Sequence, residues 1–374
     1  MQYYIYIIIA FVLSAICGFF AIPTVLNYCK KKNLYDTPNA RKIHKNKIPR
    51  LGGICFMPSM ALAFLCVIAL HNGTTIDNQV TFSLWSCFFF ISLTLIYIIG
   101  IVDDLMGLGA KPKFFVQIIA ASLIPLSGLY INNLYGLFGF YELPYWLGII
   151  ITVFVIVFVS NAINLIDGID GLSAGLSLLS LGGFLYCFTS EGLWLYGLLI
   201  ASLMGVLVAF FFFNVFGDEE KGQKIFMGDS GSLTLGFILG FLLVKFSMDN
   251  PNVMPFRRDS LMLSCTMLVV PVFDVCRIII VRLIHHQPIF NADKNHIHHK
   301  LMRTGLNQHQ TLCVILLLAI IYAIINVILS YWLDFSIIII VNIIVWLVFH
   351  QIVNIIIKKQ GSDAFQLDKD GNNN

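Results

Sequence analysis

The chain has 374 residues, of which 58% are hydrophobic and only 11% are charged, whereas soluble domains carry about 25% charged residues. This composition excludes a soluble globular protein and indicates one that crosses a membrane many times. The formal net charge of +3 is too small to predict a nucleic-acid-binding protein.

A helix needs about 20 apolar residues to cross a bilayer, and counting such stretches predicts an all-α, polytopic membrane bundle of about eleven transmembrane helices. The first stretch lacks a basic leader and a cleavage site, so we expect it to be retained as a helix. The bundle forms one predicted domain, 1–357, followed by a polar tail, 358–374, that is expected to be disordered and cytoplasmic. The predicted spans are 3–27, 52–71, 81–101, 114–131, 146–163, 172–189, 192–214, 232–247, 260–284, 311–332 and 334–357.

The loop 30–50 is rich in lysine and arginine, which predicts that it is cytoplasmic, with the N-terminus outside and the C-terminus inside. Alternation along the chain then puts the loops near 102–113, 161–173, 215–231 and 285–310 on the same face. Arg257 and Arg258, in an outside loop, are an exception to this rule. The five inside loops carry the polar motifs, so we expect one site at the cytoplasmic membrane surface.

The segment 161–175, NAINLIDGIDGLSAG, joins two of these spans. Asp167 and Asp170 are each followed by glycine, and Asn161 and Asn164 precede them at the same three-residue spacing, which places such groups on one side of a helical turn. Ionisable groups at the end of a bilayer span are rare and usually functional. The alternative is a polar helix cap followed by a tight turn.

Two further acidic motifs flank predicted spans. Asp103 and Asp104 end the third span near Lys113, and paired carboxylates of this kind suit Mg²⁺, although a solvated acidic turn is equally compatible. Asp229, within FMGDSGS, opens the eighth span, where backbone amides favour phosphate or a metal beside it. Asp229 also suits a helix cap. Phe226, one turn earlier, is a candidate platform for a planar base.

Histidines cluster at His296, His298 and His299, with Arg303 nearby. No partner ligands of the kind that zinc requires accompany them, so donors for a phosphate or a sugar are the favoured interpretation, against ordinary surface histidines. Asp274 and Arg277 lie one turn apart inside the ninth span, and we predict a structural ion pair there.

In combination these motifs resemble the polyprenyl-phosphate N-acetylhexosamine-1-phosphate transferases (glycosyltransferase 4 family), and most of all the bacterial undecaprenyl-phosphate GlcNAc-1-phosphate transferases of the WecA/TagO type. The sister enzymes that transfer phospho-N-acetylmuramoyl-pentapeptide are an alternative, but the IPRLGG of the first loop and the HIHH cluster favour the GlcNAc branch. The segments that carry the resemblance are PNARKIHKNKIPRLGG, the Asp pair, NAINLIDGIDGL, FMGDSGS, PVFDVCR and HIHH, within about 30–305.

The resemblance implies transfer of a HexNAc 1-phosphate, by family default GlcNAc-1-phosphate, from a UDP-sugar to undecaprenyl phosphate, with release of UMP. This would be the initiating step of a cell-surface glycan, at the cytoplasmic face of the bacterial inner membrane. Membrane lipids and the two substrates are the implied partners. A homodimer, the amino sugar and the glycan pathway are left open.

The resemblance also implies residue roles, with Mg²⁺ as the cofactor and Mn²⁺ as an alternative. Asp229 would be the principal metal ligand, with Asp104 and Asn164 as further ligands. Asp103, Asp104 and Asp170 would be catalytic, and a covalent Asp intermediate is left open. The implied substrate-binding residues are Asn161, Asn164, Asp167, Lys113, Phe226 (uracil stacking), His296, His298, His299 and Arg303. Asp36 falls in the first loop without an assigned role.

Two other classes of protein remain as alternatives. An ion-coupled transporter would hold its acidic residues near the bilayer midplane and show internal repeats, which the sequence lacks. A structural membrane protein would tolerate Asp103→Asn, Asp170→Asn and Asp229→Asn.

Overall fold

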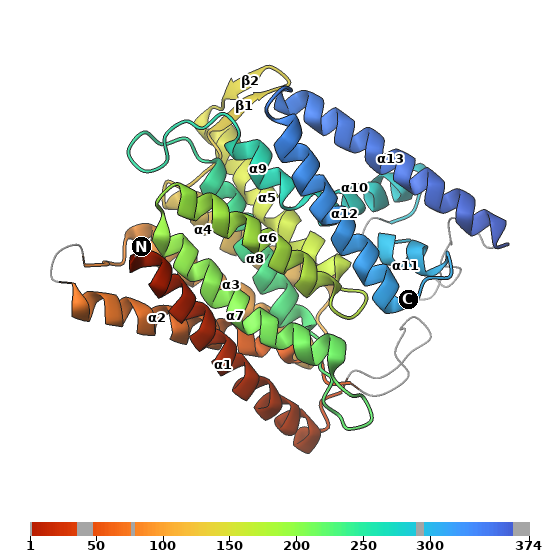
Figure 1. The fold of residues 1–374 in the computed structure, drawn as a ribbon, viewed down its shortest axis with the longest axis horizontal. Coiled ribbons are helices and arrows are strands. Elements are labelled where there is room, and N and C mark those ends of the chain that lie inside the picture. Colours follow the sequence, from red (N-terminus) through yellow and green to blue (C-terminus); the bar gives the residue numbers. More distant parts are fainter. Residues whose placement is uncertain (1, 36–47, 76–78, 289–294, 362–374) are drawn as a thin grey trace.

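The fold, taken from a computed structural model, is described here for residues 2–35, 48–75, 79–288 and 295–361, and it is a bundle of helices (Figure 1). Helices α1 and α2 lie at one side of the bundle and α12 and α13 at the other. The elements are α1 Gln2–Lys32, η1 Gly52–Cys55, α2 Phe56–Thr74, α3 Leu84–Met106, α4 Ala110–Leu126, β1 Asn133–Leu137, β2 Phe140–Glu142, α5 Tyr145–Ile166, α6 Leu172–Ser190, α7 Trp194–Phe216, α8 Gly228–Ser247, α9 Ser260–Thr266, α10 Val269–Ile284, α11 Ile297–Met302, α12 Gln308–Leu329 and α13 Phe335–Lys359.

Among the described residues, nine helices are long and apolar enough to cross a membrane. This confirms a polytopic membrane bundle, while the count of eleven spans and their orientation stay predictions. The two other predicted spans fall on shorter helices, namely α4, which has 17 residues, and the pair α9 and α10. The pair is interrupted at Met267, whose carbonyl accepts a hydrogen bond of 2.6 Å from the Ser180 hydroxyl. That bond satisfies one of the backbone groups that the interruption frees, as the membrane interior requires.

Helix α8 is the centre of the bundle, since the whole of its membrane-spanning window is buried inside the protein. It packs against α5, where small residues let the two backbones approach. A Cβ atom on Gly236 would lie 2.5 Å from the Cα of Ser160, and one on Gly240 would lie 3.0 Å from the Cα of Ile156. This four-residue glycine spacing is typical of close helix packing in membranes. It holds the start of α8 and the end of α5 at fixed positions.

A β-hairpin departs from the all-α prediction. Strands β1 and β2 are antiparallel, with Leu137 opposite Phe140, and they occupy a segment that we expected to be a loop. The connecting residues Phe138 and Gly139 both have positive φ, of 49° and 84°, as the two central residues of a tight type I′ turn require. The Phe138 backbone N–H donates to the Ser336 hydroxyl at 2.7 Å, so the hairpin rests on the start of α13.

Two hydrophobic cores organise the remaining helices. The larger surrounds α8, and the smaller lies where α6, α10, α11, α12 and α13 meet. Helices α12 and α13 bury only 22% and 28% of their membrane-spanning windows, which leaves most of their apolar side chains for lipid. Lys358 and Lys359 belong to the last turn of α13, and 362–374 of the predicted tail lie outside the described residues.

Candidate active site

The acidic pair sits in the last turn of α3. The helix ends at Gly107, whose φ of 67° is left-handed and whose N–H bonds to the carbonyl of Asp103. Carboxylates at a helix C-terminus face the negative end of the helix dipole, which is unfavourable. Positive groups from elsewhere in the chain are needed to offset this cost, and the side chains of Arg50 and Lys113 supply them.

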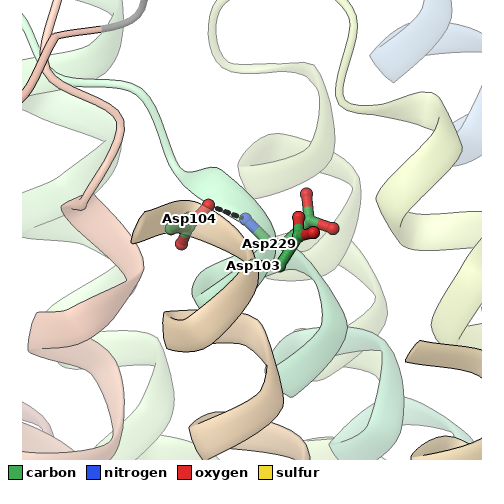
Figure 2. Close-up of side chains that lie close together, drawn as sticks. All are labelled: Asp103, Asp104 and Asp229. Carbon is green, nitrogen blue, oxygen red and sulfur yellow. Dashed lines mark hydrogen bonds between the residues drawn. The ribbon is translucent and has the colours of Figure 1, made fainter. Parts of the chain in front are cut away.

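Asp104 caps the N-terminus of α8. Its Oδ1 accepts from the backbone N–H of Asp229 at 2.7 Å (Figure 2). Its Oδ2 accepts from the backbone N–H of Ser230 at 2.9 Å. Arg50 Nη2 lies 3.5 Å from Oδ1 of the same carboxylate. Two charge-assisted bonds to backbone amides therefore lock the end of α3 to the start of α8.

Asp103, Asp104 and Asp229 form a cluster in which one oxygen of each lies within 4.8 Å of the others. Lys113, from the first turn of α4, bridges two of them, with its Nζ 3.2 Å from Asp103 Oδ2 and 2.7 Å from Asp229 Oδ2. The other oxygen of Asp103 is buried without a hydrogen-bond partner. A buried, unpartnered carboxylate oxygen inside an all-oxygen cluster fits a hard divalent cation such as Mg²⁺.

Backbone contacts fix the approach of the first loop to this cluster. Phe226 N–H donates to the Pro49 carbonyl at 2.8 Å, and Gly52 and Gly53 donate to the carbonyls of Phe226 and Met227 at 2.9 and 2.8 Å. A Cβ atom on Gly53 would clash with the backbone of Gly231. Phe226, the expected uracil platform, is half-buried there. Asp36 and the loop as far as residue 47 lie outside the described residues.

The last turns of α5 face the start of α8. Asn164 donates to the Ser232 hydroxyl at 2.8 Å, whereas Asn161 donates to Gln117 Oε1 on α4 at 2.6 Å. Asn164 is thus brought to the neighbourhood of Asp229, and Asn161 braces α5 against α4.

Asp167 and Asp170 differ in their partners. Asp170 Oδ2 lies 2.8 Å from Lys224 Nζ, which also pairs with Glu219 at 3.0 Å. The Asp167 side chain has access to solvent but lies deep among protein atoms. This crowding, together with the charges of Asp229, Asp170 and Asp104, raises the pKa of Asp167 to about 7. The loop therefore offers one acid that is paired with a lysine and one acid whose pKa is raised.

The histidine cluster reaches the same loop. His298 is buried against Gly168, where any side chain would collide with the imidazole, and neither of its ring nitrogens has a hydrogen-bond partner. Burial, followed by the charges of His299 and His296, lowers the pKa of His298 well below its usual value. His298 is therefore a neutral ring at physiological pH. The His299 ring centroid lies 4.2 Å from that of His298.

His296 is held from outside the site, with its Nδ1 2.8 Å from Asp274 Oδ2. Arg303 ends α11 and is half-buried beside the cluster. The predicted ion pair between Asp274 and Arg277 is present, with Arg277 Nη2 2.8 Å from Asp274 Oδ1.

Several residues at the site were not among the predicted ones. Asn214 on α7 accepts from Gly171 N–H at 2.6 Å and donates to the Ile225 carbonyl at 2.8 Å, so it ties the two acidic loops together. Lys224 and Gln117 likewise pair with predicted site residues. Asn214 is a single polar residue at the end of an apolar helix, and this pattern in the sequence could have identified it as a site residue.

A cavity of about 320 Å³ adjoins Asp170 through Lys224. Its other lining residues come from the end of α1, the first loop and the loop before α8, and they are Lys30, Tyr35, Ile48, Pro49, Glu219 and Gly222. The lining thus combines the Tyr35 ring with Lys30 and with Lys224, which is shared between Asp170 and Glu219.

Similarity to known proteins assigns this membrane bundle to a class of membrane-embedded transferases. The profile of glycosyl transferase family 4 matches residues 85–247. A probable undecaprenyl-phosphate N-acetylglucosaminyl 1-phosphate transferase of Bacillus subtilis is 33% identical over 364 residues, covering 93% of this chain and 91% of that protein. The chain therefore belongs to glycosyl transferase family 4.

Two further relatives are named undecaprenyl-phosphate alpha-N-acetylglucosaminyl 1-phosphate transferases. The protein of Yersinia pestis is 30% identical over 305 residues, covering 80% of this chain and 77% of its own length. That of Escherichia coli K12 is 29% identical over 311 residues, covering 81% and 78%.

Proposed function

We propose that the protein transfers GlcNAc 1-phosphate from UDP-GlcNAc to undecaprenyl phosphate, releasing UMP and initiating a cell-surface glycan. The similarity over nearly the whole chain to an undecaprenyl-phosphate GlcNAc-1-phosphate transferase supports this activity. The observation that carries the chemistry is the cluster of Asp103, Asp104 and Asp229 bridged by Lys113, at the place where the loop 167–171 and His298 also meet.

The acidic cluster is the proposed Mg²⁺ site. Asp103 and Asp229 would hold the ion, because one oxygen of Asp103 is unpartnered and the Asp229 carboxylate pairs with the Lys113 ammonium, whose place a cation can take. Asp104 and Asn164 remain candidate ligands, although both oxygens of Asp104 already accept backbone bonds. Such an ion, when bound, supplies positive charge to the diphosphate and stabilises the departing UMP.

The remaining residues are assigned to the two substrates. Lys113 would bind a phosphate oxygen, and Asp103 would orient the attacking oxygen of the lipid phosphate. That phosphate is already largely dianionic at neutral pH, because its second pKa is about 6. Phe226, Asn161, Asp167 and the cavity beside Lys224 would hold the nucleotide.

The histidines and Arg303 would bind the sugar diphosphate, because donors and cations there complement its oxygens. Asp170, neutralised by Lys224, would complete the catalytic acids.

The chemistry of the two substrates determines where the site must lie relative to the membrane. A polyprenyl phosphate stays at the membrane surface and a UDP-sugar stays in water, so the reaction requires a site at one membrane face. The lysine-rich end of α1 borders the cavity through Lys30, and basic loops favour the cytoplasmic side. We propose that the site faces the cytoplasm of a bacterial cell.

The test is turnover by purified protein. UMP release is measured with UDP-GlcNAc, undecaprenyl phosphate and Mg²⁺, and EDTA should abolish it until Mg²⁺ or Mn²⁺ is restored. Asp229→Asn should remove activity while Asp218→Asn, at an exposed site in the loop before α8, should retain it. Turnover that persists in EDTA would contradict the metal site.

A panel of UDP-sugars separates the related activities. Preference for UDP-MurNAc-pentapeptide over UDP-GlcNAc would assign the chain to the sister reaction. Ion uptake into vesicles without consumption of any UDP-sugar would instead indicate a transporter.

A further inference from the structure

Asp274 has more partners than a structural ion pair requires. It lies in the second turn of α10 with no exposed surface, and three donors converge on it. Arg277 Nη2 lies 2.8 Å from Oδ1, the backbone N–H of Ile297 lies 3.1 Å from Oδ1, and His296 Nδ1 lies 2.8 Å from Oδ2. Two of the three donors belong to a segment more than twenty residues further along the chain.

These contacts fix the orientation of the His296 ring. A carboxylate only accepts hydrogen bonds, so the Nδ1 that faces Asp274 carries a proton, and Nε2 is the ring atom that remains for a ligand. Arg277 adds a second tie to the same segment by donating from Nη2 to the Asn295 carbonyl at 2.5 Å. The start of α11 is thus held by two side chains of α10.

The oriented ring continues into the site. The His296 and His298 rings are nearly parallel, at 8° with centroids 5.9 Å apart, and His298 lies against Gly168 of the acidic loop. His298 therefore lies between His296 and the loop that carries Asp167 and Asp170.

We infer that Asp274 is a positioning residue of the transferase, which holds His296 in one tautomer and one orientation so that Nε2 faces the UDP-sugar. This inference rests on the proposed role of His296 in binding that substrate. The competing explanation is that Asp274 only pairs with Arg277 to join α10 to α11.

Asp274→Asn separates the two explanations because the neighbouring donors allow only one orientation of the new amide group. The amide oxygen must occupy the Oδ1 position, where both neighbours, Arg277 and Ile297 N–H, are donors. The amide NH₂ then faces His296 Nδ1 and forces the proton to Nε2. The variant keeps the shape of the side chain and its bonds to Arg277 and Ile297 but reverses the polarity of the bond to His296.

The experiment measures KM for UDP-GlcNAc, kcat and the melting temperature of Asp274→Asn, His296→Asn and the double variant in the full-length purified protein. His296→Asn retains an amide N–H for Asp274 and removes Nε2. Each single variant should raise KM about tenfold or more, the scale typical when the partner that orients a metal-binding histidine is removed. The double variant should be no worse than the more impaired single variant.

Arg277→Gln is the control for a structural role, since it removes the ion pair and the bond to the Asn295 carbonyl but leaves the hydrogen bond between Asp274 and His296 in place. It should lower the melting temperature more than Asp274→Asn does and raise KM less. Independent, multiplicative effects of Asp274→Asn and His296→Asn would overturn the inference, as would a normal KM in Asp274→Asn when His296→Asn is impaired. A normal KM in His296→Asn would overturn both the inference and the proposed role of His296, while UMP release by the wild type would still stand.

Discussion

Adjacent carboxylates on one helix turn have different environments at this site. Neighbouring helix residues point about 100° apart, so Asp104 reaches the backbone amides of α8 while Asp103 faces Lys113. Both oxygens of Asp104 accept backbone hydrogen bonds, whereas one oxygen of Asp103 has no hydrogen-bond partner. The sequence motif, two identical letters, gives no indication of this difference.

Lys113 provides the sharpest test of the acidic cluster. Replacing it with Gln leaves Asp103 and Asp229 facing each other without their cation. We expect the affinity of the substrate-free protein for Mn²⁺ to rise about tenfold, equivalent to about 1.4 kcal/mol, because an ion no longer competes with the ammonium. We also expect kcat/KM to fall by about 100-fold or more, as when one transition-state donor is removed.

Electron paramagnetic resonance of Mn²⁺ measures the binding, and UMP release measures the turnover. Lys113→Arg, which keeps the charge, is the control and should bind Mn²⁺ as weakly as the wild type. Unchanged Mn²⁺ affinity in Lys113→Gln would mean that the ion binds elsewhere.

At the scale of elements, glycine decides how closely η1, α3 and α8 approach. Gly53 meets the backbone of Gly231, and a Cβ atom on Gly100 would lie 2.5 Å from the Cα of Ser230. The start of α8 is thus enclosed by backbone on two sides, and the position of Asp229 depends on both contacts.

Gly53→Ala should displace η1 from α8. We expect the melting temperature to fall, since overpacking of this kind costs about 1–3 kcal/mol, and we expect UMP release to fall with it because Asp229 moves. Gly182→Ala in α6 is the matched control, because nothing lies within 4 Å of its Cβ position and alanine is favoured over glycine in a helix by up to about 1 kcal/mol. Equal losses in the two variants would show that the close contact is unimportant.

The helices were the most predictable part of the fold. Hydropathy locates a long apolar helix well, and nine of the predicted spans correspond to helices that can cross a membrane. Hydropathy does not show where a helix is interrupted, so the break at Met267 between α9 and α10 was missed. The Met267 carbonyl there accepts a hydrogen bond from the Ser180 hydroxyl of α6. Hydropathy also missed the hairpin, whose turn places Phe138 in a left-handed conformation that its residue type does not suggest.

The candidate site was predictable as a set of motifs but not as a set of contacts. Acidic residues at the ends of apolar spans singled out Asp103, Asp167 and Asp229, because such residues are costly near a membrane. The pairing of Asp274 with His296 was not predictable, since it joins positions 22 residues apart and depends on how α11 returns to α10. Their roles in the reaction remain predictions.

For the whole molecule, the arrangement of the two ends predicts a membrane topology. Helix α5 has 22 residues and therefore spans about 33 Å, and it separates the β-hairpin from the acidic site. Because the hydrocarbon core is about 30 Å thick, the hairpin and the site should lie on opposite faces.

Cysteine labelling measures this topology in intact cells. In a background whose native cysteines are replaced, Tyr141→Cys on the hairpin should react with a membrane-impermeant thiol reagent. Lys221→Cys, beside the site, should react only after permeabilisation. Both positions are exposed, so the contrast reports sidedness rather than burial. Labelling of Lys221→Cys in intact cells would reverse the proposed orientation.

The first loop is joined to residues 226 and 227 by hydrogen bonds between main-chain atoms. Three hydrogen bonds between main-chain atoms seat Pro49, Gly52 and Gly53 against the entrance to α8, and none of the three depends on side-chain identity. The register of this end of the loop against the acidic site is therefore set by the main chain, and substitutions of the Phe226 or Met227 side chain would leave all three hydrogen bonds available.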